Sequence, residues 1–289
     1  MEKISFGMAF FRTNVLQMWD GFSYGGDITQ RYREVVMYTI ATIKQLQAHL
    51  GITQLTPTET DRLLLALGAA AQHFTQETHR HFEPFVATLP HHPDPRYRHE
   101  LLVREDLLEL WSVTDELGEI AVNDVERYPS PALPLVLRLP VDRAWFGTVQ
   151  VRGLWGWHDH FNPLWQPIGT LGNGGLNAQN TTFTVLANAL PTLAIHADEV
   201  GALLRVGNEL MRVVVVSQNT YTVLRGVNHT TPETHPALAN VQCFQPSHEV
   251  VMSVLQLAEW FYRAADRQHP APFTQSVFDL CTRLRRVRV

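Results

Sequence analysis

Eight of the 14 histidines lie in two stretches of the chain, and imidazole serves both as a metal ligand and as an acid–base group. They are His73, His79, His81, His91, His92, His99, His158 and His160. Their spacing matches neither the HExxH pattern nor the paired Cys/His patterns of zinc sites. We therefore interpret them as surface or turn histidines and predict no metal site. A metal-dependent hydrolase that uses the clustered histidines remains an alternative.

Motifs for nucleophilic catalysis and phosphate binding are missing. The chain lacks a GxSxG motif, and Cys243 and Cys281 stand in no recognisable catalytic context, disulfide framework or CxxC pair. The run Gly172–Gly175 lacks the GxxxxGK[ST] pattern of a phosphate loop, so we interpret it as a flexible loop. No residue pattern identifies a catalytic or cofactor-binding site.

Two tryptophans, Trp155 and Trp157, could offer flat apolar faces to a sugar. They stand at the end of a predicted strand, where tryptophans more often fill a core. We expect core positions for both. A carbohydrate-binding or fibre-like module remains the second alternative.

Composition limits the class of protein. The chain has 289 residues, 45% of them hydrophobic, which is typical of one large folded domain or two smaller ones. Its 23 basic and 28 acidic residues give a net charge of −5, which argues against a surface built to grip nucleic acid. Its apolar runs are shorter than the roughly 18 residues of a membrane span, and its beginning lacks a cleavable signal pattern. We expect neither a membrane protein nor export by that route.

Helical periodicity appears in three places. An apolar pattern that opens at Thr39 and closes at Gly51 predicts a short amphipathic helix. The sequence from Thr56 to Glu59 is a capping box, and it predicts a helix of about 22 residues that ends near His81. Ser247 is the expected cap of a second long helix that ends before Pro270.

Alternating patterns predict strands after the long helix. The expected strands are Phe85–Leu89, Leu101–Val103, Leu107–Thr114, Glu119–Val122, Leu135–Leu139 and Thr148–Trp155. Residues 161–200 are rich in Asn, Gly, Pro and Thr and predict a long loop with at most one strand, Thr181–Ala187. A meander of three strands is expected between Leu203 and Arg225.

The predicted fold class is α+β: a small helical bundle of two long helices and a short one, with antiparallel strands and an inserted small β-domain. We divide the chain into an N-terminal extension (1–38), a core (39–160 with 247–269), an inserted loop and β-domain (161–246) and a C-terminal tail (270–289). In the tail, arginines alternate with apolar residues. This pattern suits either a solvated end or a segment that docks in a partner's groove.

The order of these segments resembles the bacteriophage head–tail connector family, the adaptor or neck proteins of tailed phages. The resemblance rests on Ile43–Ile52, Leu63–Phe82, Val149–Trp157 and Leu255–Arg263. The inserted segments Val206–Val213, Asn219–Gly226 and Thr230–His235 are similar to a β module of phage tail and fibre proteins. The family usually passes almost directly from the closing strand to the last helix, whereas residues 161–246 intervene here, and residues 1–38 have no counterpart.

The resemblance implies a structural virion protein without enzymatic activity or cofactor, made in the host cytoplasm and located in the phage neck. Its copies would form a homo-oligomeric ring, usually of twelve subunits, beneath the portal. The ring would extend the DNA channel and offer a docking platform to the next neck or tail protein, a stopper or tail terminator. Viral DNA would pass through the lumen without sequence-specific binding, and an acidic net charge suits such sliding.

The resemblance also implies that the C-terminal segment docks on the portal, because related adaptors commonly use it so. The expected contact residues are Phe278, Leu280, Leu284, Arg283, Arg285, Arg286 and Arg288. The two long helices would form the core of each subunit, and heterologous contacts would close the ring.

Overall fold

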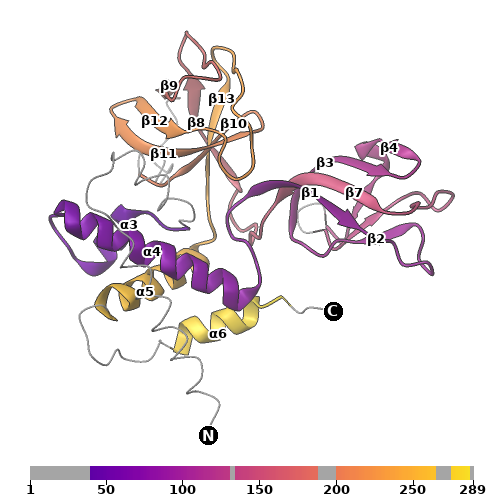
Figure 1. Ribbon diagram of the computed structural model, residues 1–289, viewed down its shortest axis with the longest axis horizontal. Helices are drawn as coiled ribbons and strands as arrows, with labels where there is room; N and C mark the ends of the chain where they lie inside the picture. Colours follow the sequence, from indigo (N-terminus) through magenta and orange to yellow (C-terminus); the bar gives the residue numbers. More distant parts are fainter. Residues whose placement is uncertain (1–39, 131–133, 188–199, 265–274, 287–289) are drawn as a thin grey trace, which may run out of the picture. The chain divides into compact units, whose positions relative to one another are not determined.

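The computed structural model describes residues 40–130, 134–187, 200–264 and 275–286. All described residues belong to one compact unit, Val36–Val289. Its elements form a cluster of helices, two sheets that share an apolar core, and a closed barrel (Figure 1). The predicted extension over 1–38 lies outside the described residues.

The predicted fold class is wrong. Of the described residues, 33% lie in strands and 27% in helices, and the architecture is mostly β, with four helices beside a six-stranded barrel and two further sheets. The long helices therefore supply one core among several instead of the core of a bundle. A long amphipathic helix gives a strong periodic signal in the sequence. A short strand in polar sequence gives a weak one, because its stability depends on pairing with strands that are distant in sequence.

The first two helices begin at capping boxes. α3 (Ile43–Leu50) is capped by Thr42 and Gln45, and α4 (Pro57–Thr78) by Thr56 and Glu59, as the sequence predicts for α4. Gly51 ends α3 with a left-handed φ of 70°, as expected. α4 ends at Thr78, three residues before the expected end, because His79 takes a left-handed φ of 55°.

α5 (His248–Ala264) and α6 (Gln275–Leu284) complete the helical cluster. α5 starts directly after Ser247, as predicted, and packs along α4. The four helices bury a common apolar core that includes Leu67, Val254 and Leu280. The tail predicted from alternating arginines is therefore a helix over most of its described length. None of the helices in the described ranges is long and apolar enough to span a membrane.

Two antiparallel sheets make up the second region. The first has the order β1 (Phe85–His91), β7 (Val149–Trp155), β3 (Leu107–Asp115) and β4 (Gly118–Ile120). The second has the order β2 (Glu100–Leu102), β6 (Val136–Arg138) and β5 (Glu126–Tyr128). A short 3-10 turn, η1 (Val122–Asp124), precedes β5. Both sheets contribute to one core around Leu101, Leu137 and Val151, and the sequence patterns predicted every strand here except β5.

The barrel has the strand order β10-β11-β12-β9-β8-β13 and closes on itself. Its strands are β8 (Trp165–Leu171), β9 (Thr182–Ala187), β10 (Leu203–Val206), β11 (Glu209–Ser217), β12 (Thr220–Leu224) and β13 (Asn240–Phe244). The predicted meander corresponds to β10, β11 and β12. The expectation that 161–200 contains at most one strand is wrong, because β8 and β9 both lie there.

β8 escaped the sequence pattern because Pro167 and Gly169 interrupt it. Pro167 lies opposite Gln242, where the register of β8 and β13 shifts, so a residue without an N–H is tolerated. A Cβ at Gly169 would lie 2.3 Å from the carbonyl oxygen of Leu186 on β9. Both residues thus serve the close packing of a barrel whose closure depends on strands far apart in sequence.

Candidate functional site

Six of the seven residues expected to dock on a partner are described, and Arg288 lies outside the described residues. Leu280 is only 7% exposed, and Leu284 packs beside it against the helical core. Phe278 is 59% exposed. The apolar face of α6 therefore already has an intramolecular partner, and Phe278 is the apolar member of the set that faces solvent.

The arginines of this segment bind the chain's own helices. Arg283 pairs with Glu249 of α5 at 2.7 Å, and Arg285 pairs with Glu77 of α4 at 2.9 Å. The backbone N–H of Arg286 donates to the carbonyl of Thr78. These pairs are open to solvent, so they leave the guanidinium groups of Arg283 and Arg285 accessible.

Arg286 has a different environment from the other two arginines. Its guanidinium lies 3.9 Å from the carboxylate of Asp106, which also forms an ion pair with Arg80. Burial lowers the pKa of Arg286. Arg80 donates in addition to the carbonyl of Leu284, so the end of α6 is tied to the end of α4. The docking of these residues on a portal remains a prediction, and Leu280 and Leu284 can reach a partner only if α6 leaves its place.

The histidines do not converge. His91 stacks on Trp155 at 5.8 Å and is 3% exposed, and burial lowers its pKa. His158 is buried beside the carbonyl of Gln245, and burial lowers its pKa too. Among the described residues, no three side chains of His, Cys, Asp or Glu lie close enough to hold a metal ion. The hydrolase alternative therefore gains no support from the described part of the chain.

The tryptophans that could have formed a sugar platform pack against other side chains of the chain. Trp155 is fully buried and donates from Nε1 to the carbonyl of Ala87. Trp157 packs against the helical core, with its ring 5.5 Å from that of Phe82. The core position predicted from the strand end is confirmed for Trp155, whereas Trp157 is half-buried at the edge of the helical core.

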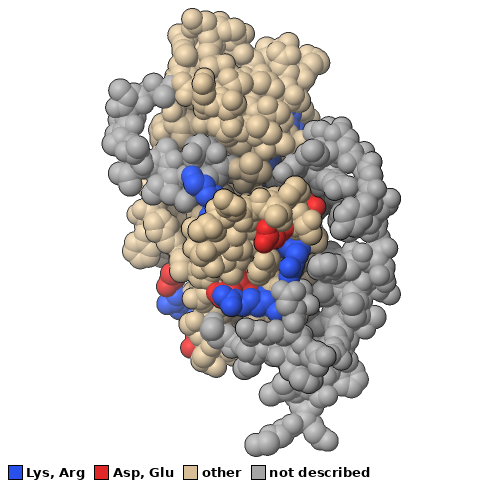
Figure 2. Space-filling view, turned by 90° about the vertical axis from the view of Figure 1, so that its left-hand side faces the viewer, with Lys and Arg blue, Asp and Glu red and all other residues tan. Residues whose placement is uncertain are grey.

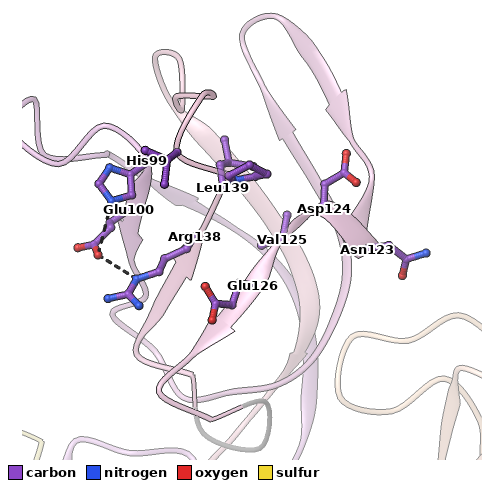
Figure 3. Close-up of a pocket in the computed structure, with 10 residues that line it drawn as sticks. His99, Glu100, Asn123, Asp124, Val125, Glu126, Arg138 and Leu139 are labelled. Carbon is purple, nitrogen blue, oxygen red and sulfur yellow. Dashed lines mark hydrogen bonds and ion pairs between the residues drawn. The ribbon is translucent and has the colours of Figure 1, made fainter.

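A hollow of the described surface lies on the smaller sheet and has a volume of about 570 Å³. Its charged and polar lining comes from three separate stretches: His99 and Glu100, Asn123 to Glu126, and Arg138. Glu100 accepts a hydrogen bond from Arg138 at 2.9 Å. Figure 3 shows the carboxylates of Glu100 and Glu126 on either side of that guanidinium, in agreement with the strand register. The hollow suits a polar contact, and sequence reasoning missed it because only the sheet joins its parts.

The carboxylate of Glu209, at the start of β11, lies at the centre of a buried hydrogen-bond network. It is 0% exposed and accepts hydrogen bonds from Arg225 at 2.5 and 2.6 Å and from the backbone N–H groups of Gly226 and Glu233. It also bonds His235 at 2.8 Å. Burial alone would raise the pKa of Glu209, but these hydrogen bonds lower it below its ordinary value.

Arg225 extends this network into the loops of the barrel. It donates to the carbonyls of Asn177 and Asn180 in the β8–β9 connection and to that of Glu233. We call Glu209, Arg225 and His235 the barrel lock. All three residues lie in the segments that resemble the phage β module, but their joint role could not be seen before the fold placed them together.

The barrel keeps nearly all its charges internal. Its described residues carry five charged side chains, namely Arg205, Glu209, Arg212, Arg225 and Glu233. Arg205 pairs with Glu109 of β3, and Arg212, which is 2% exposed, pairs with Glu83 just before β1. These two bidentate pairs flank an apolar contact of the barrel with the larger sheet. On the face of the molecule that Figure 2 draws, the upper part, which belongs to the barrel, shows almost no charged side chains.

No protein-family model matches the chain, and no curated protein sequence matches it significantly.

Proposed function

We propose that the chain is a structural protein of a tailed-phage virion, a head–tail connector whose copies form a ring beneath the portal. In this role it extends the DNA channel and carries the next neck or tail protein, without catalysis. The proposal places the protein in the phage neck, with copies of itself, the portal and a stopper or tail terminator as partners.

The barrel lock is the observation that carries this proposal. The segments that resemble a β module of phage tail and fibre proteins contain Glu209, Arg225 and His235, which form one buried hydrogen-bonded network in the barrel. A resemblance whose segments meet in one buried network is stronger support than one that follows composition. The proposal does not depend on a helical bundle, because the order of α3, α4, β7 and α5 agrees with the quoted segments while the rest of the subunit is mostly β.

The exposed side of α6 is the proposed contact with the portal. Phe278 offers an apolar anchor, and Arg283 and Arg285, near the end of the segment, add guanidinium groups that are about half exposed, 62% and 45%. Aromatic and arginine side chains are typical anchors of protein interfaces. Leu280 and Leu284 support this surface from behind while α6 stays in its groove.

The test is the mass of the purified protein, alone and mixed with the portal protein of the same phage. Phe278→Asp is the test variant, and Phe161→Asp is its matched control, because Phe161 is an apolar side chain 92% exposed on another part of the surface. We expect a multi-subunit complex that contains the portal, retained by Phe161→Asp and lost or weakened at least about tenfold by Phe278→Asp. A chain that stays monomeric and ignores the portal in every form would refute the proposal.

A further inference from the structure

The smaller sheet (β2-β6-β5) has one covered face and one open face. Leu101 and Leu137 lie in the core of the two-sheet region and are 0% exposed. The side chains that alternate with them belong to the opposite face, where Leu102 and Tyr128 are 57% and 43% exposed. Within the described residues, the three strands pair with one another and no further strand joins them. The outer face of this sheet is therefore open to a partner.

The register of the three strands sorts the outer side chains into two rows. Arg138 lies opposite Glu100 on one side and Glu126 on the other, and these three side chains form the charged row. The next row along the strands is apolar and consists of Leu102, Val136 and Tyr128. Arg138 joins the two rows, because its guanidinium lies 3.6 Å from the ring centroid of Tyr128 and donates to Glu100.

Negative charge prevails in the hollow at the charged row. Its lining includes the carboxylates of Glu100, Asp124 and Glu126, and Arg138 brings the one guanidinium of the lining. Glu100 is paired with Arg138, and Asp124 with Arg143. The carboxylate of Glu126 forms no hydrogen bond or ion pair in the part of the chain that the structure describes. It is therefore the position at which this face can accept a cation.

The charge of the face selects the class of partner. A second copy would set the same carboxylates against one another, and nucleic acid would bring phosphates to them, so like charge disfavours both. A basic group instead meets the unpaired carboxylate of Glu126. Apolar side chains suit the neighbouring row, since covering Leu102 and Tyr128 removes exposed apolar surface from water.

The distance between the rows sets the spacing in the partner. On each of the three strands, the charged and the apolar side chain stand two residues apart. Two residues of an extended chain rise by about 6.6–6.8 Å, and their side chains share one face. An extended segment laid along these strands therefore meets both rows when its basic and its apolar residue also stand two positions apart.

We propose that the outer face of the smaller sheet binds an extended segment of another protein, in which a lysine or arginine stands two positions from an aliphatic residue. The basic group pairs with Glu126 at the hollow, and the aliphatic side chain covers Leu102 and Tyr128. Figure 3 shows the charged end of this face, with the carboxylate of Glu126 beside Arg138. The inference is independent of the connector proposal, because it uses neither α6 nor the ring.

Fluorescence anisotropy of a labelled peptide tests this binding on the full chain. The probe is Thr-Lys-Thr-Leu-Thr-Lys-Thr-Leu-Thr, whose lysines and leucines share one face when extended. Thr-Lys-Leu-Thr-Thr-Lys-Leu-Thr-Thr has the same composition but places them on opposite faces, and a third peptide has glutamate for lysine. We expect saturable binding of the probe, at least about fivefold tighter than that of either control peptide and weaker at high salt. Equal binding of the probe and a control peptide overturns the inference.

A pair of double variants locates the binding. Leu102→Ser/Glu126→Gln changes two exposed side chains of the face, and we expect it to weaken probe binding at least about tenfold. Leu117→Ser/Glu119→Gln makes the same two changes at exposed positions of the larger sheet and should leave binding unchanged. Circular dichroism checks that both variants fold. Equal binding by the two variants, or no saturable binding by the unchanged protein, overturns the inference and leaves the connector proposal intact.

Discussion

The barrel and α6 are held in the molecule by opposite means. In the barrel, every described strand has two strand neighbours, and the charges of Glu209 and Arg225 are 0% and 4% exposed. α6 has one covered face, and its ion pairs through Arg283 and Arg285 lie in water. The same residue types thus form a buried network of several hydrogen bonds in the barrel and solvent-exposed ion pairs at α6.

The difference shows how one chain can combine a tightly bonded part with a more weakly attached one. Removing one partner from a buried pair leaves a charge without water or counter-charge, whereas a broken surface pair is simply hydrated. The barrel is therefore expected to lose its structure as a whole, and α6 to come away alone. The following variants test this contrast, from the largest expected effect to the smallest.

Glu209→Gln should have the largest effect. It removes the charge that Arg225 and His235 bind and leaves a buried guanidinium unpaired, which costs about 3–5 kcal/mol of unfolding free energy. Urea unfolding followed by circular dichroism measures the loss. Glu233→Gln is the matched control, because the Glu233 side chain is exposed. The substitution also keeps the backbone N–H of residue 233, which donates a hydrogen bond to Glu209. Equal unfolding midpoints for the two variants would contradict the role of the barrel lock.

Leu280→Ala should loosen α6 and leave the barrel intact. Truncating a buried leucine costs about 2–5 kcal/mol, and here the loss falls on the groove contact of a short helix. The two cysteines report each region separately. Burial raises the pKa of the Cys281 thiol to about 11, so release of α6 makes it far more reactive, while Cys243 stays in the barrel core.

Thiol labelling with assignment by mass spectrometry provides this measurement. We expect Cys281 to react at least about tenfold faster in Leu280→Ala than in the unchanged protein, with Cys243 unaffected. Phe278→Ala, on the exposed side of the same helix, should leave both rates unchanged. Parallel acceleration of both cysteines would mean that α6 and the barrel unfold together.

Acidification should destabilise the two-sheet region through His91. Burial against Trp155 keeps the pKa of His91 below its ordinary value, and Glu105, Arg104 and His92 are the charged groups around it. The unfolded chain takes up a proton near pH 6.5 that the folded chain does not, so stability is complete above that pH and falls as the pH drops toward the folded pKa.

The measurement is the urea midpoint between pH 7.5 and 5. The protein should lose stability over this range by less than Leu280→Ala costs. His91→Leu, which keeps an apolar side chain against Trp155, should give a shallower pH profile. An identical profile would assign the acid sensitivity to other groups, such as His158, whose pKa burial also lowers.

Arg285→Ala should have the smallest effect. Its pair with Glu77 is 45% and 42% exposed, and such pairs contribute about 0–1 kcal/mol. Thermal unfolding at low and high salt measures it, and salt should erase the difference from the unchanged protein. Arg225→Ala is the counterpart in the barrel and should cost several times more at any salt concentration, because its partner Glu209 is out of water. Similar costs for both arginines would remove the contrast between the regions.

Local signals accounted for the parts of the fold that were predicted correctly. The capping box at Thr56 and Glu59 and the left-handed Gly51 each act within one turn of chain, so their effect can be read from neighbouring residues. Strands β5, β8 and β13 were missed, and for β8 the reason is the opposite one. Pro167 and Gly169 look like loop residues until the bulged pairing with β13 and the close approach of β9 show why they are needed.

For the C-terminal candidate site, the sequence predicted the residues but not how they are arranged in space. An apolar stripe with arginines indicates that α6 docks somewhere, and the structure adds that Leu280 and Leu284 dock on the chain's own helices. The stripe could not reveal this, because a helical pattern describes the face of one element and carries no information on its partner. For the same reason the hollow around Glu100 and Arg138 had no signature in the sequence.

The sequence alone determined the long helices, most strands and the presence of a charged, amphipathic C-terminal segment, since these depend on periods and caps within a few residues. Only the tertiary structure decided that the protein is mostly β, that the barrel closes, and that Glu209 meets Arg225 and His235. Closure and burial depend on pairing between distant segments. Their free energy comes from removing apolar and charged groups from water together, which no single segment does alone.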